Sequence, residues 1–429
     1  MAKIKITEIV DFNPNRPLKR GMVAPFVDMA ALPVNARDII EIGSREYTGN
    51  GAKFKNGDTL FSRITPCLEN GKTAKVSALA DDIIAHGSTE FIVLAAKDPK
   101  YDEDFVYYVA RLPEFRAFAI ARMEGTSGRQ RVSWQALSDF EYSFPDKEER
   151  KEIGALLKTI DDQIFVSHQI NLKVEKMAQA IFKSWFVHFE PVRARTAAIE
   201  AGEDPILASM RCISGKNKAD LDAMKILDSH SYDELRKIAN LFPDALIESE
   251  LGLIPEGWTI SNVGEILELA YGKGLKELNR NEGNIPVYGS GGVTGSHNDY
   301  LVQGPGIIVG RKGTVGSIYY EGGNFFPIDT VFYVIPRNNI PLSYCYFTLR
   351  NLKLNTMNTD AAVPGLNRRN VYRLRIPTVP TSLILIFDKY VNGLMKLMSM
   401  QKETTLVLAN LRDILLPELI SGNLPIHHN

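Results

Sequence analysis

Apolar residues recur at alternating steps of four and three through residues 147–190, and this pattern predicts one long helix. The seam positions are Ile153, Leu157, Ile160, Ile164, Ser167, Asn171, Val174, Ala178, Ile181 and Trp185. A heptad pattern of this kind is typical of a helix that buries one stripe against a partner helix. At about 1.5 Å per residue, the helix would be on the order of 60 Å long.

The same seam recurs 234 residues later in the chain. The second set of positions is Phe387, Val391, Leu394, Met398, Gln401, Thr405, Leu408, Arg412, Leu415 and Leu419. Only Ala178 against Arg412 breaks the match between apolar and polar positions. An internal duplication explains this agreement, and the alternative is two unrelated amphipathic helices on separate cores. Duplicated helices of this kind can pair antiparallel within one chain.

Short apolar runs between Gly, Pro and Asn residues fill the segments before each long helix and predict strands and loops with few helices. Strands are expected at 57–66, 88–96 and 140–144, and helical spacing runs through 101–122. Asp146 and Glu149 have the spacing of a helix N-cap and its capping-box partner. The first long helix is therefore expected to begin at residue 147.

Segments of the first half also recur in the second half. LFSR at 60–63 answers IVGR at 308–311 at an offset of 248, and TEFIVL at 89–94 answers TVFYVI at 330–335 at an offset of 241. SGRQRVSW at 127–134 answers PGLNRRNV at 364–371. The expected fold is α+β, with two similar, β-rich mixed α/β domains separated by two long antiparallel helices that form an intrachain coiled coil with pseudo-twofold symmetry. The expected boundaries are 1–146 for the first domain, 147–190 for the central helix, 191–250 for a helical linker, 251–381 for the second domain, 382–421 for the C-terminal helix and 422–429 for a tail.

Composition narrows the class of protein without identifying it. A chain of 429 residues suggests two or three domains, and 45% hydrophobic with 24% charged residues is ordinary for a globular protein. Because the sequence contains neither a long apolar run nor a signal-peptide core, neither a membrane span nor secretion is expected. Cys67, Cys212 and Cys345 are far apart and are expected to be reduced thiols of a cytoplasmic protein. The net charge of −1 shows no basic excess over the whole chain. A surface that binds nucleic acid would therefore need basic residues gathered on one part of the protein.

The sequence offers no convincing catalytic or metal-binding constellation. The glycine-rich segment 289–296 lacks the Lys-Ser/Thr ending of a phosphate-binding loop. Asp146, Glu149 and Lys151 mimic the charged set of a metal-dependent nuclease, but a helix cap accounts for the carboxylates. We therefore expect no catalytic residue and no metal site.

The recurring chemistry is a set of hydrogen-bond donors and hydroxyls on loops at matching places in both domains. Arg, Lys, Gln and Asn side chains read base edges, while Ser and Thr hydroxyls hold phosphates. The candidate DNA-binding residues are Arg63, Lys72, Lys75, Ser88, Thr89, Ser127, Arg129, Gln130, Arg131, Lys273, Ser290, Arg311, Lys312, Thr314, Asn367, Arg368 and Arg369. Any one of them alone is more often an ordinary surface group, so the repetition supports the set rather than its members.

Aromatic residues crowd the end of the first long helix. Phe182, Trp185, Phe186 and Phe189 offer more apolar surface than one helix seam covers. An exposed cluster of this kind predicts a docking surface for another chain.

Four further motifs stand at the helix ends and at the start of the second domain: MAQAIFKSWFVHFEPV at 177–192, LFPDALIESELG at 241–252, LGLIPEGW at 251–258 and LRDILLPELISGNL at 411–424. With these motifs in this order, the chain resembles the specificity subunit of a type I restriction-modification system. GDTLFSR at 57–63 and IVGRKGTVG at 308–316 resemble segments of that family's recognition domains. The near-neutral charge departs from a simple basic DNA-binding protein.

The resemblance implies a function that spacing alone does not give. Each target-recognition domain would read one half of a bipartite, asymmetric site in double-stranded DNA, and the paired helices would set the spacer between the halves. The helices and their aromatic end would dock two methyltransferase subunits, which restriction and translocase subunits would join. S-adenosylmethionine, ATP and magnesium would belong to those partners, so this chain would need no cofactor. The alternatives are a self-contained DNA-modifying enzyme and a coiled-coil protein adaptor.

Overall fold

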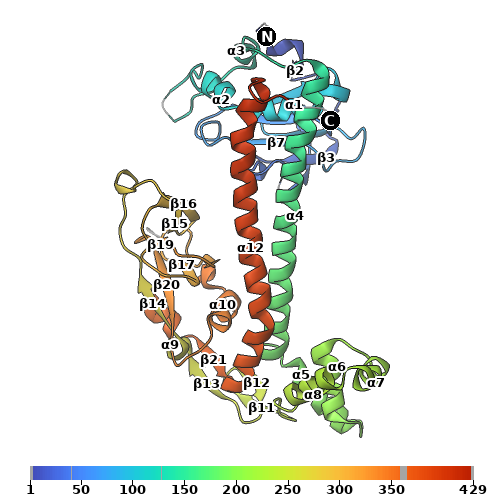
Figure 1. Cartoon of the computed structure of the whole chain (residues 1–429), viewed down its shortest axis with the longest axis vertical. Helices are drawn as coiled ribbons and strands as arrows, with labels where there is room; N and C mark the ends of the chain where they lie inside the picture. The colour runs from blue at the N-terminus through green and yellow to red at the C-terminus, as the bar shows by residue number, and fades with distance from the viewer. Residues whose placement is uncertain (1–2, 40, 127, 358–364, 427–429) are drawn as a thin grey trace. The chain divides into compact units, whose positions relative to one another are not determined.

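The computed structural model describes residues 3–39, 41–126, 128–357 and 365–426. It divides into two compact units (Figure 1). The first contains Met1–Gln169 and Gln401–Asn429, and the second contains Ile170–Met400. Each unit therefore combines one β-rich domain with part of both long helices.

The β-rich domain of the first unit contains two four-stranded sheets. One sheet is antiparallel, with strands in the order β2 (Val10–Phe12), β9 (Phe91–Ala96), β6 (Thr59–Ser62) and β7 (Thr73–Lys75). The other has the order β4 (Gly43–Glu46), β3 (Val23–Val27), β8 (Ala85–Gly87) and β5 (Ala52–Phe54). Both faces of the central strands β6 and β9 are buried, and β9 is accordingly apolar throughout, whereas β6 carries the buried hydroxyls of Thr59 and Ser62.

Helical residues in this domain follow the predicted spacing, with one break. Residues 101–122 form α1 (Pro99–Arg111) and α2 (Pro113–Ile120), because Pro113 cannot continue the first helix. Phe105, Val109 and Phe115 from these helices pack in one core with Phe61 and Ile92 of the sheet. The predicted strand at 140–144 is shorter than expected, forming only β10 (Glu141–Tyr142), which pairs with β1 (Ile4–Lys5).

The second unit repeats the main sheet of the first. Its antiparallel sheet has the order β14 (Leu267–Tyr271), β20 (Val331–Pro336), β17 (Gly306–Gly310) and β18 (Ile318–Glu321). A three-stranded sheet has the order β16 (Gly292–His297), β15 (Ile285–Gly289) and β19 (Phe326–Pro327), and α10 (Leu342–Asn351) belongs to the same domain. The predicted helical linker forms α5 (Glu190–Glu200), α6 (Pro205–Ser214), α7 (Lys218–Leu227) and α8 (Ser229–Ala239). Helices α6, α7 and α8 share a small core that includes Met210, Leu221 and Leu235.

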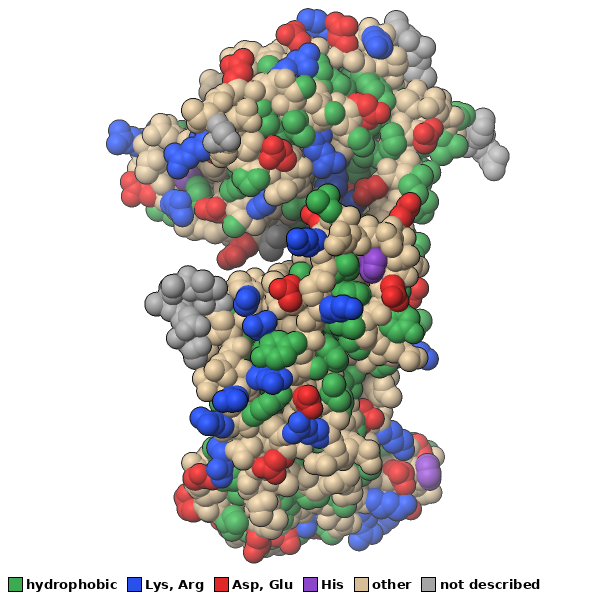
Figure 2. Space-filling view, turned by 90° about the vertical axis from the view of Figure 1, so that its left-hand side faces the viewer, with side chains coloured by type: hydrophobic (Ala, Val, Ile, Leu, Met, Phe, Trp, Pro, Cys, Tyr) green, Lys and Arg blue, Asp and Glu red, His purple; other side chains and the backbone are tan. Residues whose placement is uncertain are grey.

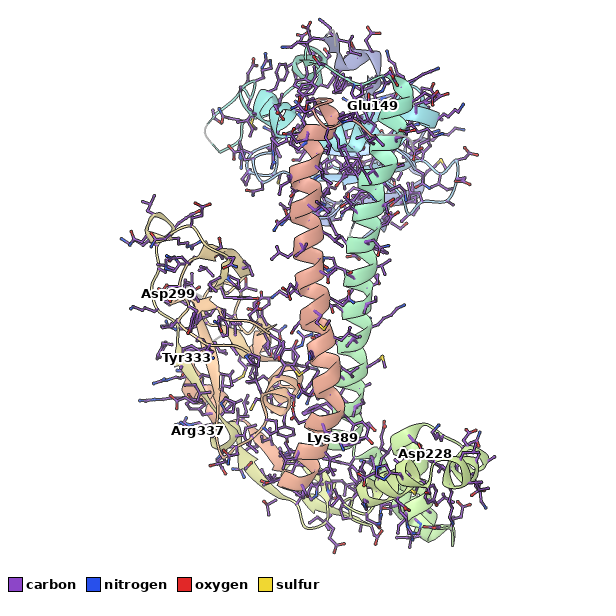
Figure 3. All side chains as sticks on the ribbon, viewed as in Figure 1. Glu149, Asp228, Asp299, Tyr333, Arg337 and Lys389 are labelled. Carbon is purple, nitrogen blue, oxygen red and sulfur yellow. The ribbon has the colours of Figure 1, made fainter. Side chains whose placement is uncertain are left out.

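The two long helices are α4 (Lys147–Phe186) and α12 (Thr381–Ile420), each of 40 residues. Glu149 lies in the first turn of α4 (Figure 3). The Asp146 carboxylate accepts a hydrogen bond from the Glu149 amide at 3.0 Å, so α4 begins where the sequence predicts. In the first unit, the seam residues Ile153 and Leu157 of α4 share a core with Leu416 and Leu419 of α12.

In the second unit, Ala178, Phe182 and Trp185 share a core with Phe387 and Val391. Within each unit, an early part of one helix therefore packs against a late part of the other. This antiparallel intrachain pairing and the presence of two similar mixed α/β domains confirm the predicted fold class.

The internal repeat is real, but one predicted register is wrong. Ser62 lies opposite Phe91 in the first main sheet, and Gly310 lies opposite Val331 in the second. The offset of 248 for the first strand is therefore confirmed, whereas the offset for the second is 240 rather than 241. A shift of one residue exchanges the two faces of a strand, and apolar residues on both faces hid this error in the sequence.

The predicted match between 127–134 and 364–371 is also out of register, by three residues. The short helices α3 (Trp134–Ser138) and α11 (Arg368–Tyr372) follow the N-cap residues Ser133 and Asn367, whose side chains each accept a backbone hydrogen bond. Their offset is 234, the same as that of the long helices. Arg129, Gln130 and Arg131 are therefore not the counterparts of Asn367, Arg368 and Arg369.

The expectation of an exposed aromatic cluster at the end of α4 is wrong. Phe182, Trp185, Phe186 and Phe189 are each at most 5% exposed. The rings of Phe186 and Tyr344 are 5.4 Å apart, those of Trp185 and Phe242 are 5.6 Å apart, and those of Phe189 and Trp258 are 5.7 Å apart. Helix α10, the end of the linker and the start of the second domain cover these rings, so they form a core rather than a docking surface.

Candidate nucleic-acid interface

Arg63 and Arg311 occupy the same structural position in the two domains. Each directly follows a central strand of its main sheet, β6 or β17. The Arg63 amide donates to Glu90 O at 3.0 Å, and its carbonyl accepts from the Val132 amide at 3.0 Å.

The Arg311 amide likewise donates to Thr330 O at 2.9 Å, and its carbonyl accepts from the Leu366 amide at 2.8 Å. This shared junction joins a strand end to two loops that lie far apart in the sequence. It therefore brings candidate residues from separate segments together in both domains.

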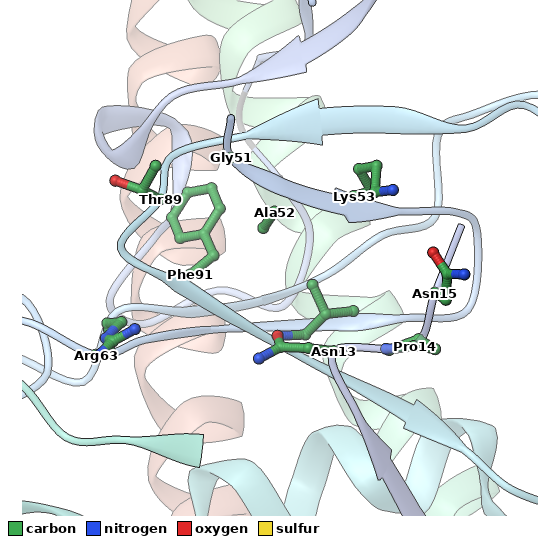
Figure 4. Close-up of a pocket in the computed structure, with 10 residues that line it drawn as sticks. Asn13, Pro14, Asn15, Gly51, Ala52, Lys53, Arg63, Thr89 and Phe91 are labelled. Carbon is green, nitrogen blue, oxygen red and sulfur yellow. The ribbon is translucent and has the colours of Figure 1, made fainter. Parts of the chain in front are cut away.

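A groove of about 390 Å³ opens beside this junction in the first domain (Figure 4). Its apolar lining includes Phe91 and Val93. Its polar lining comes from Asn13, Asn15, Lys53, Arg63 and Thr89. The lining includes two cationic side chains and no carboxylate, so its charge suits an anionic polymer.

One wall of the groove is held rigidly by Asn13. Its backbone lies in the left-handed region at φ 46°, where Asn is tolerated better than most residues. Its amide donates to Val93 O at 2.8 Å, and its side-chain Oδ1 accepts from the Val93 amide at 2.8 Å. Asn13 therefore continues the edge of the sheet, and its carboxamide is anchored.

The Arg63 guanidinium has no carboxylate partner within the described residues, and its buried Nε has no hydrogen-bond acceptor there. Glu90, the residue to which the Arg63 amide donates, is instead bound by Arg131. The Arg131 Nε and Nη2 atoms donate to the Glu90 carboxylate at 2.7–3.0 Å, and these hydrogen bonds raise the pKa of Arg131. Arg131 thus neutralises the acidic group next to Arg63.

Several other candidates of the first domain lie outside the groove lining. Lys72 Nζ donates to Met29 O at 2.9 Å, and the Ser88 hydroxyl accepts from the Glu90 amide at 3.1 Å. Gln130 is tied to Thr65 through its backbone, and Arg129 is exposed. Ser127 lies outside the described residues.

Lys75 must be removed from the set of DNA-binding candidates. Its side chain is buried, and its ammonium group is paired with Asp104 and with Glu103. The ion pairs satisfy the buried charge and leave none of it facing solvent. Lys75 is the last residue of β7, and all three residues of this strand are buried. The strand therefore lacks the alternation of buried and exposed positions from which the burial of Lys75 could have been predicted.

In the second domain, two guanidinium groups converge on the ring of Tyr271. The guanidinium carbon of Arg311 lies 4.8 Å from the ring centroid, and that of Arg368 lies 4.7 Å from it. Arg311 Nη1 also donates to Asp329 O at 3.0 Å, and Arg368 Nη1 donates to Leu269 O at 3.4 Å. Planar guanidinium groups stack well on aromatic rings, so this cluster is a preformed cationic platform.

The remaining second-domain candidates lie on several separate loops. The Thr314 amide donates to the Ser290 hydroxyl at 3.4 Å, which joins two of the loops. The Asn367 side chain accepts from the Arg369 amide at 2.9 Å, so its carbonyl oxygen serves as a helix cap. Lys273, Lys312 and Arg369 are exposed. Figure 2 shows Lys and Arg side chains beside exposed hydrophobic groups on one face of this unit.

The structure adds four residues that the sequence interpretation missed: Asn13, Asn15, Lys53 and Tyr271. The Asn-Pro-Asn segment after β2 was a usable signal, because such residues mark a turn at a strand end. Tyr271 precedes Gly272 and Lys273, which was a weaker signal. Lys53 offered none, since only the pairing of β5 with β8 places it beside the groove.

In the described part of the chain, no group of three or more His, Cys, Asp and Glu side chains is arranged to hold a metal ion. Among the same residues, no helix combines the length and apolarity that crossing a membrane requires.

Comparison with known proteins gives a consistent result. The family model for the type I restriction modification DNA specificity domain matches residues 3–176 and 255–403. The type I restriction enzyme HindI specificity subunit of Haemophilus influenzae is 26% identical over 414 residues, which cover 89% of each chain. The type I restriction enzyme EcoAI specificity subunit of Escherichia coli is 23% identical over 252 residues, covering 52% of this chain and 43% of that one.

Solved structures with similar chains come from the same class. The S subunit of a type I restriction-modification system from M. genitalium has a TM-score of 0.49 and 19% identity, covering 100% of this chain and 96% of that one. The HsdS subunit from Thermoanaerobacter tengcongensis has a TM-score of 0.34 and 16% identity, covering 99% and 97%.

Proposed function

The chain belongs to the family of type I restriction-modification DNA specificity subunits, and from that membership we propose that each of its β-rich domains reads one half of a bipartite site in double-stranded DNA. Subunits of this family recognise DNA and are not themselves catalytic. One observation carries the proposal for two half-sites. The junction at Arg63 is repeated at Arg311 with the same pair of backbone hydrogen bonds, and cationic side chains surround both copies.

DNA reading by these junctions predicts a steep dependence of affinity on salt, because phosphate contacts release counterions. The test is selection of random-sequence duplexes by the purified full chain, followed by titration of the selected duplex at several salt concentrations. Two short sequence elements at a fixed separation are the expected result. A chain that selects no sequence, with an affinity that does not change with salt, would instead be the coiled-coil protein adaptor.

The paired helices α4 and α12 would set the separation between the two half-sites. Their equal length of 40 residues and their heptad seam support this role, because a whole heptad can be added to both helices without changing the faces that pair. A variant with one heptad inserted in each helix is expected to select the same two elements with a longer spacer. An unchanged spacer in that variant contradicts the role of the helices as a ruler.

The same helices would dock two methyltransferase subunits, on a surface other than the buried aromatic cluster. On α12, Val407, Leu411 and Ile414 recur at steps of four and three, one residue before the seam positions, and they are 59%, 43% and 67% exposed. Phe165 and Val166 of α4, in the same unit, are 49% and 47% exposed. Exposed apolar side chains in such a series mark a protein interaction site.

Val407→Glu with Ile414→Glu tests this docking surface. The double variant is expected to keep its thermal stability and its DNA preference but to lose co-purification with the methyltransferase subunits. Glu403→Gln on the same helix is the control, since it changes a charge without touching the stripe. Co-purification of the double variant at the wild-type ratio would place the docking surface elsewhere.

Methyl transfer, ATP hydrolysis and cleavage would then belong to the partner subunits, together with S-adenosylmethionine, ATP and magnesium. The remaining alternative is a self-contained DNA-modifying enzyme. It predicts methylation or cleavage of DNA by the purified chain when those three compounds are supplied. We expect no such activity from the chain alone and methylation of the selected sequence once methyltransferase subunits are added.

A further inference from the structure

We propose that Arg63 reads the major-groove edge of a guanine in one half of the DNA site, and that Arg311, its structural counterpart, reads no base. This assignment rests on the proposed function and adds to it a base identity and a difference between the two domains. It follows from the different surroundings of the two guanidinium groups.

Arg63 combines an anchored backbone with a guanidinium that has no hydrogen-bond partner among the described residues. Its backbone is held on both sides by hydrogen bonds to Glu90 O and from the Val132 amide, each 3.0 Å long. Its Nε is buried, so Nη1 and Nη2 form the edge that remains for a ligand. Guanine is the base that offers two acceptors, O6 and N7, at the spacing of this fork.

The groove around Arg63 favours a base edge over a phosphate. Phe91 and Val93 give it an apolar lining, and Asn13 is anchored to the sheet by its side chain. Lys53 also lines the groove; its flexible ammonium group suits the phosphate backbone, while the planar guanidinium suits paired acceptors. Glu90, the nearest competing acceptor pair along the chain, is occupied by Arg131.

The guanidinium of Arg311 differs from that of Arg63 in its hydrogen-bond partners and in its contacts with aromatic rings. One of its terminal nitrogens already donates to Asp329 O at 3.0 Å. Its guanidinium carbon lies 4.8 Å from the Tyr271 ring centroid and 5.8 Å from that of Phe332. Arg311 is therefore part of the platform of the second domain and lacks a free fork.

Single-atom changes in the DNA test the assignment directly. The full chain first selects its sequence from random duplexes, and 7-deazaguanine then replaces each guanine in turn. This base keeps its pairing but lacks N7. At one guanine, confined to one half of the site, wild-type affinity is expected to fall roughly 5-fold or more, because one of the two hydrogen bonds to the guanidinium is lost. Arg63→Ala removes both hydrogen bonds, so it is expected to bind the unmodified duplex about 5- to 150-fold more weakly than the wild type and to lose nothing more when that guanine is replaced.

Matched variants separate the assignment from a general loss of charge. Lys53→Ala should weaken binding to all sequences alike, and Arg311→Ala should keep the sensitivity to 7-deazaguanine. Arg63→Lys keeps the charge but not the fork, so it should behave as Arg63→Ala at the critical guanine. Thermal unfolding of Arg63→Ala should match the wild type because no other described side chain pairs with the guanidinium.

Two results overturn the assignment while leaving the proposed function intact. One is equal sensitivity of the wild type and Arg63→Ala to 7-deazaguanine at every guanine. The other is weakening by Arg63→Ala that is uniform over all sequences, which would make Arg63 a phosphate contact. A wild-type chain that selects no bipartite sequence overturns the proposed function and this assignment together.

Discussion

Arg412 and Asp161 form an ion pair inside the first unit, with Nη1 and Oδ1 2.6 Å apart and each side chain 1% exposed. The second Asp161 oxygen accepts from the Tyr108 hydroxyl at 2.7 Å, and Arg412 Nη1 also lies 3.4 Å from Asn35 O. Burial lowers the pKa of Arg412, but Asp161, Asp413 and Tyr107 together raise it by more, so the guanidinium stays charged. The one mismatched seam position is thus a buried cation with a dedicated partner.

Arg412→Met is expected to destabilise the first unit by about 3–5 kcal/mol, because it leaves the Asp161 carboxylate buried without its counterion. Hydrogen exchange of residues 401–420 measures the loss. Adding Asp161→Asn removes the second charge and keeps an acceptor for Tyr108, so the double variant should recover much of the stability. Asn410→Ala on the same helix is the control, since that side chain is exposed, whereas Asp413 pairs with Arg412 at 2.8 Å. Equal protection in Arg412→Met and the wild type contradicts the prediction.

Glu175 has the corresponding role in the second unit. Its Oε1 accepts from the Tyr346 hydroxyl at 2.7 Å and pairs with Arg350 Nη2 at 2.9 Å. Glu175→Ala leaves the buried hydroxyl without an acceptor and should cost about 1–3 kcal/mol, observed as faster hydrogen exchange in α10. Lys176→Ala changes the exposed neighbour and should leave α10 protected. Unaltered exchange in the Glu175 variant would show that the two bonds do not hold α10 in place.

Trp185→Ala should destabilise the second unit by about 3–5 kcal/mol, because it empties a site in a well-packed aromatic core. The measurement is the denaturant midpoint, followed by the remaining tryptophan fluorescence. Ser184→Ala, one residue earlier on α4, should cost far less because it removes only a short polar side chain. A Trp185→Ala chain with wild-type stability and defective partner binding would restore the aromatic cluster as a docking surface.

Cys345 should resist alkylation in the folded chain. Burial raises the pKa of its thiol to about 12, and burial also raises that of Cys212 to about 11. At pH 8 about one Cys345 thiol in 10,000 would be ionised, and the fraction rises tenfold per pH unit until the pH nears the pKa. With iodoacetamide, Cys212 should therefore react before Cys345, and urea should remove the difference. Rapid labelling of Cys345 at pH 8 without urea contradicts this order.

The same raised pKa makes the second unit sensitive to alkaline pH. From about 9, the ordinary thiol value, up to about 12, the unfolded chain loses a proton that the folded chain keeps. In this pH window the unfolded chain binds fewer protons than the folded chain. The free energy of unfolding therefore falls as pH rises from about 9 to about 12. Cys345→Ala should flatten the slope between pH 9 and 11 in denaturant titrations. An unchanged slope in that variant would assign the alkaline loss to other groups.

Arg131→Ala should weaken specific DNA binding measurably, because it frees the Glu90 carboxylate beside Arg63. Titration of the selected duplex measures the change. Glu90→Gln in the same chain removes the acidic group and should restore most of the affinity. If the double variant binds as weakly as Arg131→Ala, then Arg131 contacts DNA directly.

Periodic features were predictable from the sequence. The heptad seam gave both long helices, their pairing and the N-cap at Asp146, and the repeated strand before Arg63 and Arg311 gave the shared junction. These features depend on residue spacing, which the chain displays directly. Registers were less accessible, because β9 and β20 are apolar on both faces and a shift of one residue leaves their pattern unchanged.

Burial of charged and aromatic side chains was not predictable, because it depends on what a distant segment places over them. Lys75 is charged yet buried through Asp104, and Trp185 looked exposed until Phe242 and Phe387 were brought against it. Lys53 reached the groove only through strand pairing. The loops that meet at each junction could be predicted from the sequence. Which of their residues line each site became known only from the tertiary structure.

The sequence offset between equivalent residues of the two copies changes along the segments before Val132 and Leu366. After these residues the offset stays constant up to the ends of the long helices. Loops in the first part can gain or lose residues independently, because each closes on its own sheet. The helices cannot, since one extra residue in either would rotate every later seam position by about 100° away from its partner. Evolution has therefore been free to change the length of the recognition loops. Any change in the length of the long helices had to occur in α4 and α12 together.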